Sequence, residues 1–125
     1  MSPSLPRPTD GELAILKVIW DRGPCTVRQV YEVLSENRDL GYTTVLKMLQ
    51  IMTEKGLVNR EEQGRGHLYR TRLSEEQTQR HLISDLLEKA FGGSALKLMM
   101  QALATHKASR EELDEIRKLL DRGHR

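Results

Sequence analysis

The chain has 125 residues, which is enough for one ordinary domain or for a small domain with an appendage. Hydrophobic residues make up 38% of it and aromatic residues only 4%, so we expect a soluble protein with an aliphatic, mainly helical core. No apolar run reaches the roughly 18 residues of a membrane span, and the Pro-rich start lacks a signal-peptide stretch. These features predict a cytoplasmic protein without membrane insertion.

The single cysteine and the placement of charge narrow the class of protein further. Cys25 alone cannot form an internal disulfide or a thiolate metal cluster. We expect it to be a small half-buried residue, with a redox sensor as the alternative. The net charge is only +2, but residues 41–73 hold six Lys and Arg against three Asp and Glu. This local excess favours an anionic partner near the middle of the chain.

The N-terminal region predicts an arm followed by a helix. Residues 1–8 contain three prolines and predict a flexible arm. Thr9 and Glu12 have the spacing of a capping box, in which each side chain satisfies a backbone amide at a helix start. Apolar residues at helical spacing continue to Trp20, and the Gly-Pro pair at 23–24 ends this predicted helix.

Two more helices are expected before residue 57. A second capping box, Thr26 with Gln29, opens a helix that is expected to end near Asn37. The third predicted helix spans residues 42–55, because its apolar residues recur every three or four positions and Gly56 then provides a stop.

The pattern changes after the third helix. Residues 57–73 lack a helical apolar stripe and carry β-forming residues on both sides of Gly64 and Gly66. They predict a β-hairpin with its tip at residues 63–67. Three helices followed by a hairpin with a basic tip is the order of a winged helix-turn-helix domain, which we assign to residues 9–73.

Residues 74–125 are predicted to be helical, with capping-box spacing after Ser74 and Ser109 and a further helix from Ser94. So small an amphipathic unit cannot hide its own apolar faces, so a second copy is expected to cover them. The predicted fold is therefore mainly α with a small β-hairpin wing, a winged helix-turn-helix followed by an all-helical dimerisation domain. The residues expected at the dimer interface are Leu82, Leu86, Leu87, Phe91, Leu96, Met99, Met100, Leu103, Leu113, Ile116 and Leu120.

Two adjacent threonines open the third predicted helix, although helix interiors tend to avoid β-branched hydroxyl residues. In a helix-turn-helix this helix start enters the major groove, where short hydroxyls can meet phosphates and base edges. On a helical wheel Thr43, Thr44 and Lys47 lie together, away from the apolar face. The alternative is that a threonine caps the helix and Lys47 is a solvated charge. The residues expected to bind DNA are Tyr42, Thr43, Thr44, Lys47, Arg65, His67 and Arg28.

The hairpin tip and the second helix supply the other basic candidates. Arg65 stands between two glycines, where a guanidinium can reach a phosphate or the minor groove; an ordinary basic turn is the alternative. Arg28 lies near the start of the second helix, where it can meet a phosphate or be a plain surface residue.

The sequence resembles the penicillinase repressor family, which includes the BlaI and MecI repressors and their copper-responsive CopY relatives. The matching stretches, in order, are ELAILKVIWDRGPCTVRQVYEVL, YTTVLKMLQ, EKGLVNREEQGRGHLYR, FGGS and EELDEIRKLL, and the resemblance as a whole covers about residues 9–120. The resemblance implies a dimeric winged-helix repressor of a pseudo-palindromic operator. It places helix 42–55 in the major groove, turn 63–67 as the wing and the C-terminal helices as the dimerisation domain.

The chain also departs from the family pattern. Many members have a basic residue in place of Ile51 and a small polar one in place of Lys47, which implies a different preferred operator. The resemblance alone implies a membrane sensor protease as a partner, but the Asn-Phe bond cleaved in penicillinase members is absent, and Gln101-Ala102 stands about where it would fall. The Cys-rich tail of the copper-responsive branch is also absent.

No catalytic signature is present. The four histidines, at positions 67, 81, 106 and 124, are scattered, and the sequence contains no metal-binding or phosphate-loop motif. We therefore expect no enzyme activity, no cofactor and no metal. The alternative to operator binding is a winged-helix protein-interaction module without sequence-specific DNA binding.

Overall fold

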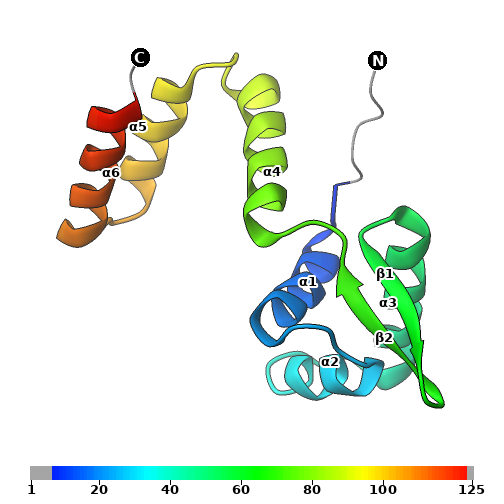
Figure 1. Ribbon diagram of the computed structural model, residues 1–125. Helices are drawn as coiled ribbons and strands as arrows, with labels where there is room; N and C mark the ends of the chain where they lie inside the picture. The colour runs from blue at the N-terminus through cyan, green and yellow to red at the C-terminus, as the bar shows by residue number, and fades with distance from the viewer. Residues whose placement is uncertain (1–6, 124–125) are drawn as a thin grey trace. The chain divides into compact units, whose positions relative to one another are not determined.

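The computed structural model describes residues 7–123. The elements in chain order (Figure 1) are α1 (Asp10–Arg22), α2 (Val27–Leu34), α3 (Tyr42–Lys55), β1 (Val58–Gln63), β2 (Gly66–Thr71), α4 (Glu75–Ala90), α5 (Ala95–Thr105) and α6 (Arg110–Gly123). A mainly helical chain with a two-stranded wing after α3 confirms the predicted fold class. The predicted arm over residues 1–8 lies mostly outside the described residues.

Side-chain caps set the helix starts as predicted. The Thr9 hydroxyl accepts from the N–H of Glu12 at 3.2 Å, and the Glu12 carboxylate accepts from the N–H of Thr9 at 2.9 Å. Each such pair satisfies two backbone donors that the helix itself leaves open. The same reciprocal bonds open α2, α4 and α6, at Thr26–Gln29, Ser74–Gln77 and Ser109–Glu112.

The end of α2 differs from the prediction. The helix stops at Leu34 rather than near Asn37. The Ser35 hydroxyl donates to the carbonyl of Glu32 at 3.3 Å, and the N–H of Arg38 returns to the carbonyl of Leu34 at 2.9 Å. These bonds close the helix with turns, because a short hydroxyl side chain competes for backbone groups that would otherwise extend it.

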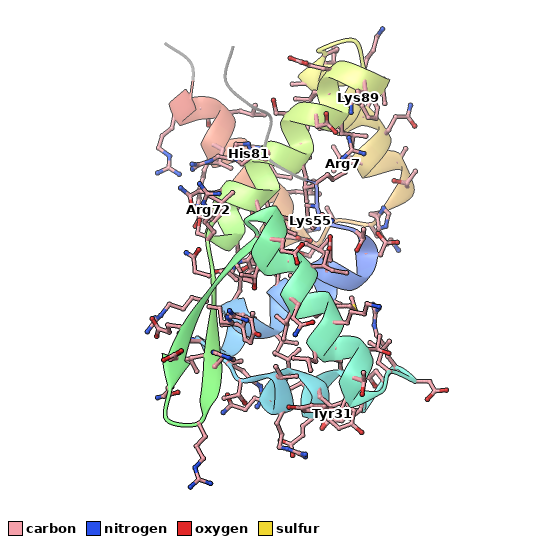
Figure 2. All side chains as sticks on the ribbon, turned by 90° about the vertical axis from the view of Figure 1, so that its right-hand side faces the viewer. Arg7, Tyr31, Lys55, Arg72, His81 and Lys89 are labelled. Carbon is pink, nitrogen blue, oxygen red and sulfur yellow. The ribbon has the colours of Figure 1, made fainter. Side chains whose placement is uncertain are left out.

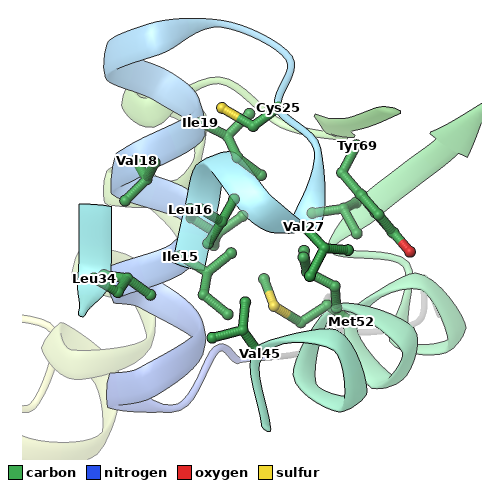
Figure 3. Packing of buried hydrophobic residues seen from close by; sticks show 13 residues of the cluster. Ile15, Leu16, Val18, Ile19, Cys25, Val27, Leu34, Val45, Met52 and Tyr69 are labelled. Carbon is green, nitrogen blue, oxygen red and sulfur yellow. The ribbon is translucent and has the colours of Figure 1, made fainter. Parts of the chain in front are cut away.

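One apolar core joins α1, α2, α3 and the wing (Figure 3). Ile15, Val30 and Leu49 are fully buried where the three helices meet, and Val58 and Tyr69 extend the core into the strands. Each side chain of this size contributes about 1.5–3 kcal/mol when it leaves water. The core therefore fixes which face of α3 points inwards.

The wing is an antiparallel hairpin in which Val58 lies opposite Thr71 and Gln63 lies opposite Gly66. Its two-residue tip has Gly64 at a φ of 60°. That angle belongs to the first central residue of a type II′ turn, which glycine adopts without steric cost and whose twist matches that of the strands. The tip therefore presents Arg65 just beyond the last paired residues of the hairpin.

Cys25 is attached to the wing through its backbone. It exchanges two hydrogen bonds with Tyr69, at 3.1 and 2.8 Å. The side chain is 2% exposed rather than half-buried as expected, because this pairing turns it into the core. Burial raises the pKa of the thiol even though Arg22 opposes the shift. A buried neutral thiol is a poor nucleophile, which disfavours the redox alternative.

The chain divides into two compact units, residues 1–82 and residues 83–125. In the first unit the indole N–H of Trp20 donates to the carbonyl of Leu73 at 3.1 Å and so holds the segment that precedes α4. The predicted boundary between residues 73 and 74 stays a prediction.

Among the described residues, no helix is long and apolar enough to cross a membrane, and no cluster of His, Cys, Asp and Glu could hold a metal ion.

An ion pair between a buried carboxylate and a more exposed ammonium connects the start of α1 with the end of α3. The Lys55 ammonium donates to both carboxylate oxygens of Glu12, at 2.8 and 2.9 Å, and Glu12 is 5% exposed. Burial alone would raise the pKa of Glu12, but the bonds from Lys55 and from the N–H of Thr9 together lower it below its ordinary value. Glu12 therefore stays charged and anchors α3 to α1.

This pair makes stability depend on pH in a defined direction. Because the pKa of Glu12 is lower in the folded chain, the ion pair stabilises the fold above the ordinary glutamate pKa of about 4.3 and is lost as the pH falls below it. Glu12→Gln keeps the capping geometry but removes the charge. It is expected to lower the free energy of unfolding at pH 7 by about 1.5–3 kcal/mol, the range for a hydrogen bond to a charged group.

Urea denaturation at pH 7 and at pH 3.5 measures this effect. The matched control is Glu36→Gln, at an exposed position in the turn after α2, which is expected to change stability little at either pH. The difference between Glu12→Gln and the wild type is expected to shrink at the lower pH, and an equal difference at both values would contradict the assignment.

Candidate nucleic-acid interface

Helix α3 has one buried and one exposed face. Val45, Leu49 and Met52 are fully buried, at the spacing that places them on one side of a helix. Thr43 and Lys47 are exposed on the other side. The packing of α3 against the core therefore turns the predicted DNA-contacting residues outwards.

The start of α3 is open. Its N-cap residue is Gly41, and no side chain caps the helix. Thr43 and Thr44 lie within the first turn, so the alternative in which a threonine caps α3 is wrong. The other described helices, α1, α2, α4, α5 and α6, each begin at a Ser or Thr whose side chain accepts a backbone N–H. The first amides of α3 carry the positive end of the helix dipole and suit an anion.

Three side chains from α2 and α3 pack at this open end. The rings of Tyr31 and Tyr42 meet edge to face with centroids 5.8 Å apart. The guanidinium carbon of Arg28 lies 5.5 Å from the centroid of Tyr42, within cation–π distance. Tyr42 is 40% exposed, so this cluster holds an aromatic ring and a cation beside the first turn of α3. The structure brings Arg28 together with the predicted α3 residues, and Tyr31 is a partner that the sequence pattern missed.

The wing carries the remaining predicted residues at two different depths. Arg65 is exposed at the tip. His67 lies on β2 opposite Glu62 and is half-buried; its Nδ1 is buried without a hydrogen-bond partner among the described residues. Arg70 forms an ion pair with Glu61 at 3.0 Å. Arg65 is therefore the predicted wing residue with the most open surroundings.

The cations at the C-terminal end of α3 differ in surroundings from Lys47 on its exposed side. Figure 2 labels Tyr31 near the start of α3, and Lys55 and Arg72 near its other end. Lys55 is held by Glu12, and a guanidinium nitrogen of Arg72 lies 2.9 Å from where a Cβ on Gly56 would stand. Cations at a helix C-terminus complement its dipole. These two therefore support the helix end, while Lys47 faces outwards.

Two exposed residues on the outer face of α3 were not predicted as site residues. Gln50 and Ile51 lie three and four positions after Lys47 and are both exposed, so they share its side of the helix. The same helical wheel that groups the threonines with Lys47 would have found both. A glutamine amide can pair with adenine in the major groove.

The predicted dimerisation residues lie on helices that expose much of their apolar surface. Leu96 is 70% exposed and Met100 58%. Neither α5 nor α6 contains a buried residue. Among the other predicted residues, Leu82, Leu87, Phe91 and Ile116 are half-buried, and Leu86, Met99, Leu103, Leu113 and Leu120 are exposed. Ile83 and Leu119, which were not predicted, are also exposed.

Comparisons with known proteins bear on this arrangement. The family model described as penicillinase repressor matches residues 8–122. The transcriptional regulator BlaI of Mycobacterium tuberculosis is 35% identical over 127 residues, which cover 96% of this chain and 89% of that protein. The penicillinase repressor of Bacillus licheniformis is 25% identical over 117 residues, 94% of this chain and 91% of that protein.

Two solved structures of transcriptional regulators are also similar to this chain. The monomeric form of Bacillus licheniformis BlaI in complex with the blaP half-operator is 29% identical with a TM-score of 0.52, covering 58% of this chain and 88% of that one. A probable transcriptional regulator from Pseudomonas aeruginosa, 22% identical with a TM-score of 0.51, covers 93% of this chain and 78% of that one and shows a similar fold. Since the family model spans nearly the whole chain, this protein belongs to the penicillinase repressor family of winged-helix transcriptional regulators.

Proposed function

We propose that this chain represses transcription by binding double-stranded operator DNA, with α3 in the major groove and the wing on the adjacent backbone. The observation that carries the proposal is the start of α3, where exposed hydroxyls and uncapped backbone amides lie in the first turn and Lys47 is exposed in the next turn. A helix-turn-helix presents this part of its recognition helix to DNA. The similarity to BlaI bound to the half-operator covers the same domain.

The residues divide into those that position the domain and those that read bases. Uncapped amides at the start of α3 and the Arg28 guanidinium suit phosphate oxygens, which fix register without carrying sequence information. Thr43 and Thr44 suit base edges, while the Lys47 ammonium suits a phosphate oxygen on the same side of the helix. Because Arg28 is already oriented over the ring of Tyr42, it loses little freedom on binding.

Arg65 completes the interface from the wing. Its guanidinium stands at the exposed tip of the hairpin, where it can reach a phosphate or enter the minor groove. His67, at the base of the tip, is a secondary contact in this proposal because its ring is half-buried.

We assign the C-terminal helices to a homodimer interface. Helices of 11 and 14 residues that bury no side chain are marginal in water, and a second copy would cover their apolar faces. Two winged-helix domains would then occupy operator half-sites about 34 Å apart, one turn of duplex. A cytoplasmic location fits such a target.

Induction by a membrane sensor protease rests on family resemblance alone. The Gln101–Ala102 bond, which stands about where the family's cleaved bond falls, lies inside α5. A protease needs an extended substrate, so this helix would have to open locally before cleavage.

The operator proposal can be tested with duplexes selected by the full-length chain from a random library. Lys47→Ala and Arg65→Ala are each expected to weaken binding and to reduce the steepness of its salt dependence by about one, because each phosphate contact releases about one counterion. Fluorescence anisotropy between 50 and 200 mM salt, about the range over which such slopes are measured, gives both quantities.

The matched control for these variants is Lys17→Ala, at an exposed position on α1 and on neither α3 nor the wing. Its salt slope is expected to equal that of the wild type. Unchanged affinity and slope in both Lys47→Ala and Arg65→Ala would instead favour a winged-helix module that binds protein.

The dimer proposal predicts a separate effect on assembly. Leu96→Glu places a charge on a side chain that is 70% exposed in the protomer, so it should cost the protomer little but disrupt an interface that buries it. Sedimentation velocity is expected to show a dimer for the wild type and a protomer for Leu96→Glu. Lys97→Gln, at the next position of α5, is expected to remain dimeric, and a wild-type protomer at micromolar concentration would refute the assignment.

A further inference from the structure

Ile51 is the feature of α3 that its packing does not explain. It is 42% exposed, whereas Val45, Leu49 and Met52 on the opposite side are fully buried. A β-branched side chain also has a lower helix propensity than the long straight side chains common on exposed faces. Ile51 therefore contributes little to the core or to the helix itself.

Its place on the helix gives it a surface in common with the proposed DNA contacts. Thr44, Lys47 and Ile51 follow one another at i, i+3 and i+7, which is a single row along the helix surface. A single exposed apolar residue is ordinary on a protein surface. An apolar residue in this row is different, because the proposed docking of α3 removes the row from water.

The chemistry of the major groove identifies the group that Ile51 would meet. An isoleucine side chain has no donor or acceptor, and the thymine C5-methyl is the apolar group that base pairs present in that groove. Helix α3 also contains no arginine, the side chain that most often reads guanine; Lys55 is held by Glu12, and Lys47 is assigned to a phosphate in the proposed docking.

We propose that Ile51 contacts the methyl group of a thymine in each operator half-site and so makes thymine a requirement at that position. The inference rests on the proposed operator binding and names one element of its specificity. Ile51 lies seven residues after Thr44, which is about 10 Å along the helix axis. The thymine therefore belongs to a different part of the half-site from the base that Thr44 faces.

Replacing thymine by uracil isolates this contact, because uracil pairs identically and lacks only the methyl group. A duplex selected by the wild-type full-length chain is resynthesised with deoxyuridine at one thymine position at a time, in both half-sites together. At one position the wild type is expected to lose about fifteenfold in affinity, the value of burying one methyl group in each of the two half-sites. This scan needs no protein variant.

Combining the uracil duplex with variants at position 51 in a double-mutant cycle tests whether Ile51 is the partner of that methyl group. Ile51→Ala, present in both protomers, is expected to bind the thymine duplex about fifteenfold more weakly than the wild type and to lose nothing further with uracil at the same position. Ile51→Val, which keeps two methyl groups, is expected to retain part of the discrimination. Circular dichroism checks that both variants keep the wild-type helix content.

The possible results distinguish failure of the Ile51 contact from failure of operator binding itself. If Ile51→Ala distinguishes thymine from uracil at every position as the wild type does, Ile51 makes no methyl contact and the inference fails while operator binding stands. If the library yields no preferred sequence, operator binding fails and the inference fails with it.

Discussion

The interface depends on the packing of one face of α3 into the core. Val45, Leu49 and Met52 are fully buried, and rotating the helix to expose any of them would cost about 1.5–3 kcal/mol per side chain. This burial fixes the rotation of α3 and so decides that Thr43 and Lys47 face outwards. The ion pair between Lys55 and Glu12 then holds the far end of the helix. The residue types on the exposed face of α3 can therefore change with little effect on the fold, because the buried face and the ion pair hold the helix in place.

Capped and uncapped helix starts differ in the same way as the buried and exposed faces of α3: one stabilises the fold, and the other is open to a ligand. A capping side chain satisfies backbone donors within the protein, and it thereby removes them from any ligand. The capping boxes at Thr9 and Thr26 stabilise helices that hold the scaffold. Helix α3 gives up that stabilisation at Gly41, and its packing against α1, α2 and the wing compensates. Stability and binding thus make opposite demands on a helix start, and in the proposed interface this chain meets them on different helices.

The sequence alone predicted what local patterns encode. Capping boxes, apolar periodicity and the glycines of the wing are short-range signals, and the structure follows them at each site. Contacts between distant segments were not predictable in this way. The burial of Cys25 depends on backbone pairing with Tyr69, and the Tyr31–Tyr42 contact depends on the path of the turns after Leu34. The early end of α2 was missed because Ser35 bonds back to the helix instead of extending it.

The two units of the chain obtain their stability from different sources. Residues of the first unit bury a shared apolar core, so its fold needs no partner. In the second unit, α5 and α6 bury no side chain, so in the proposed dimer their order is inseparable from association. Operator affinity would then depend on dimerisation twice. In that dimer, association would order the C-terminal helices. It would also raise the effective concentration of the second winged-helix domain at the operator once the first is bound. A signal that separates the protomers could therefore release the operator without altering any residue of α3.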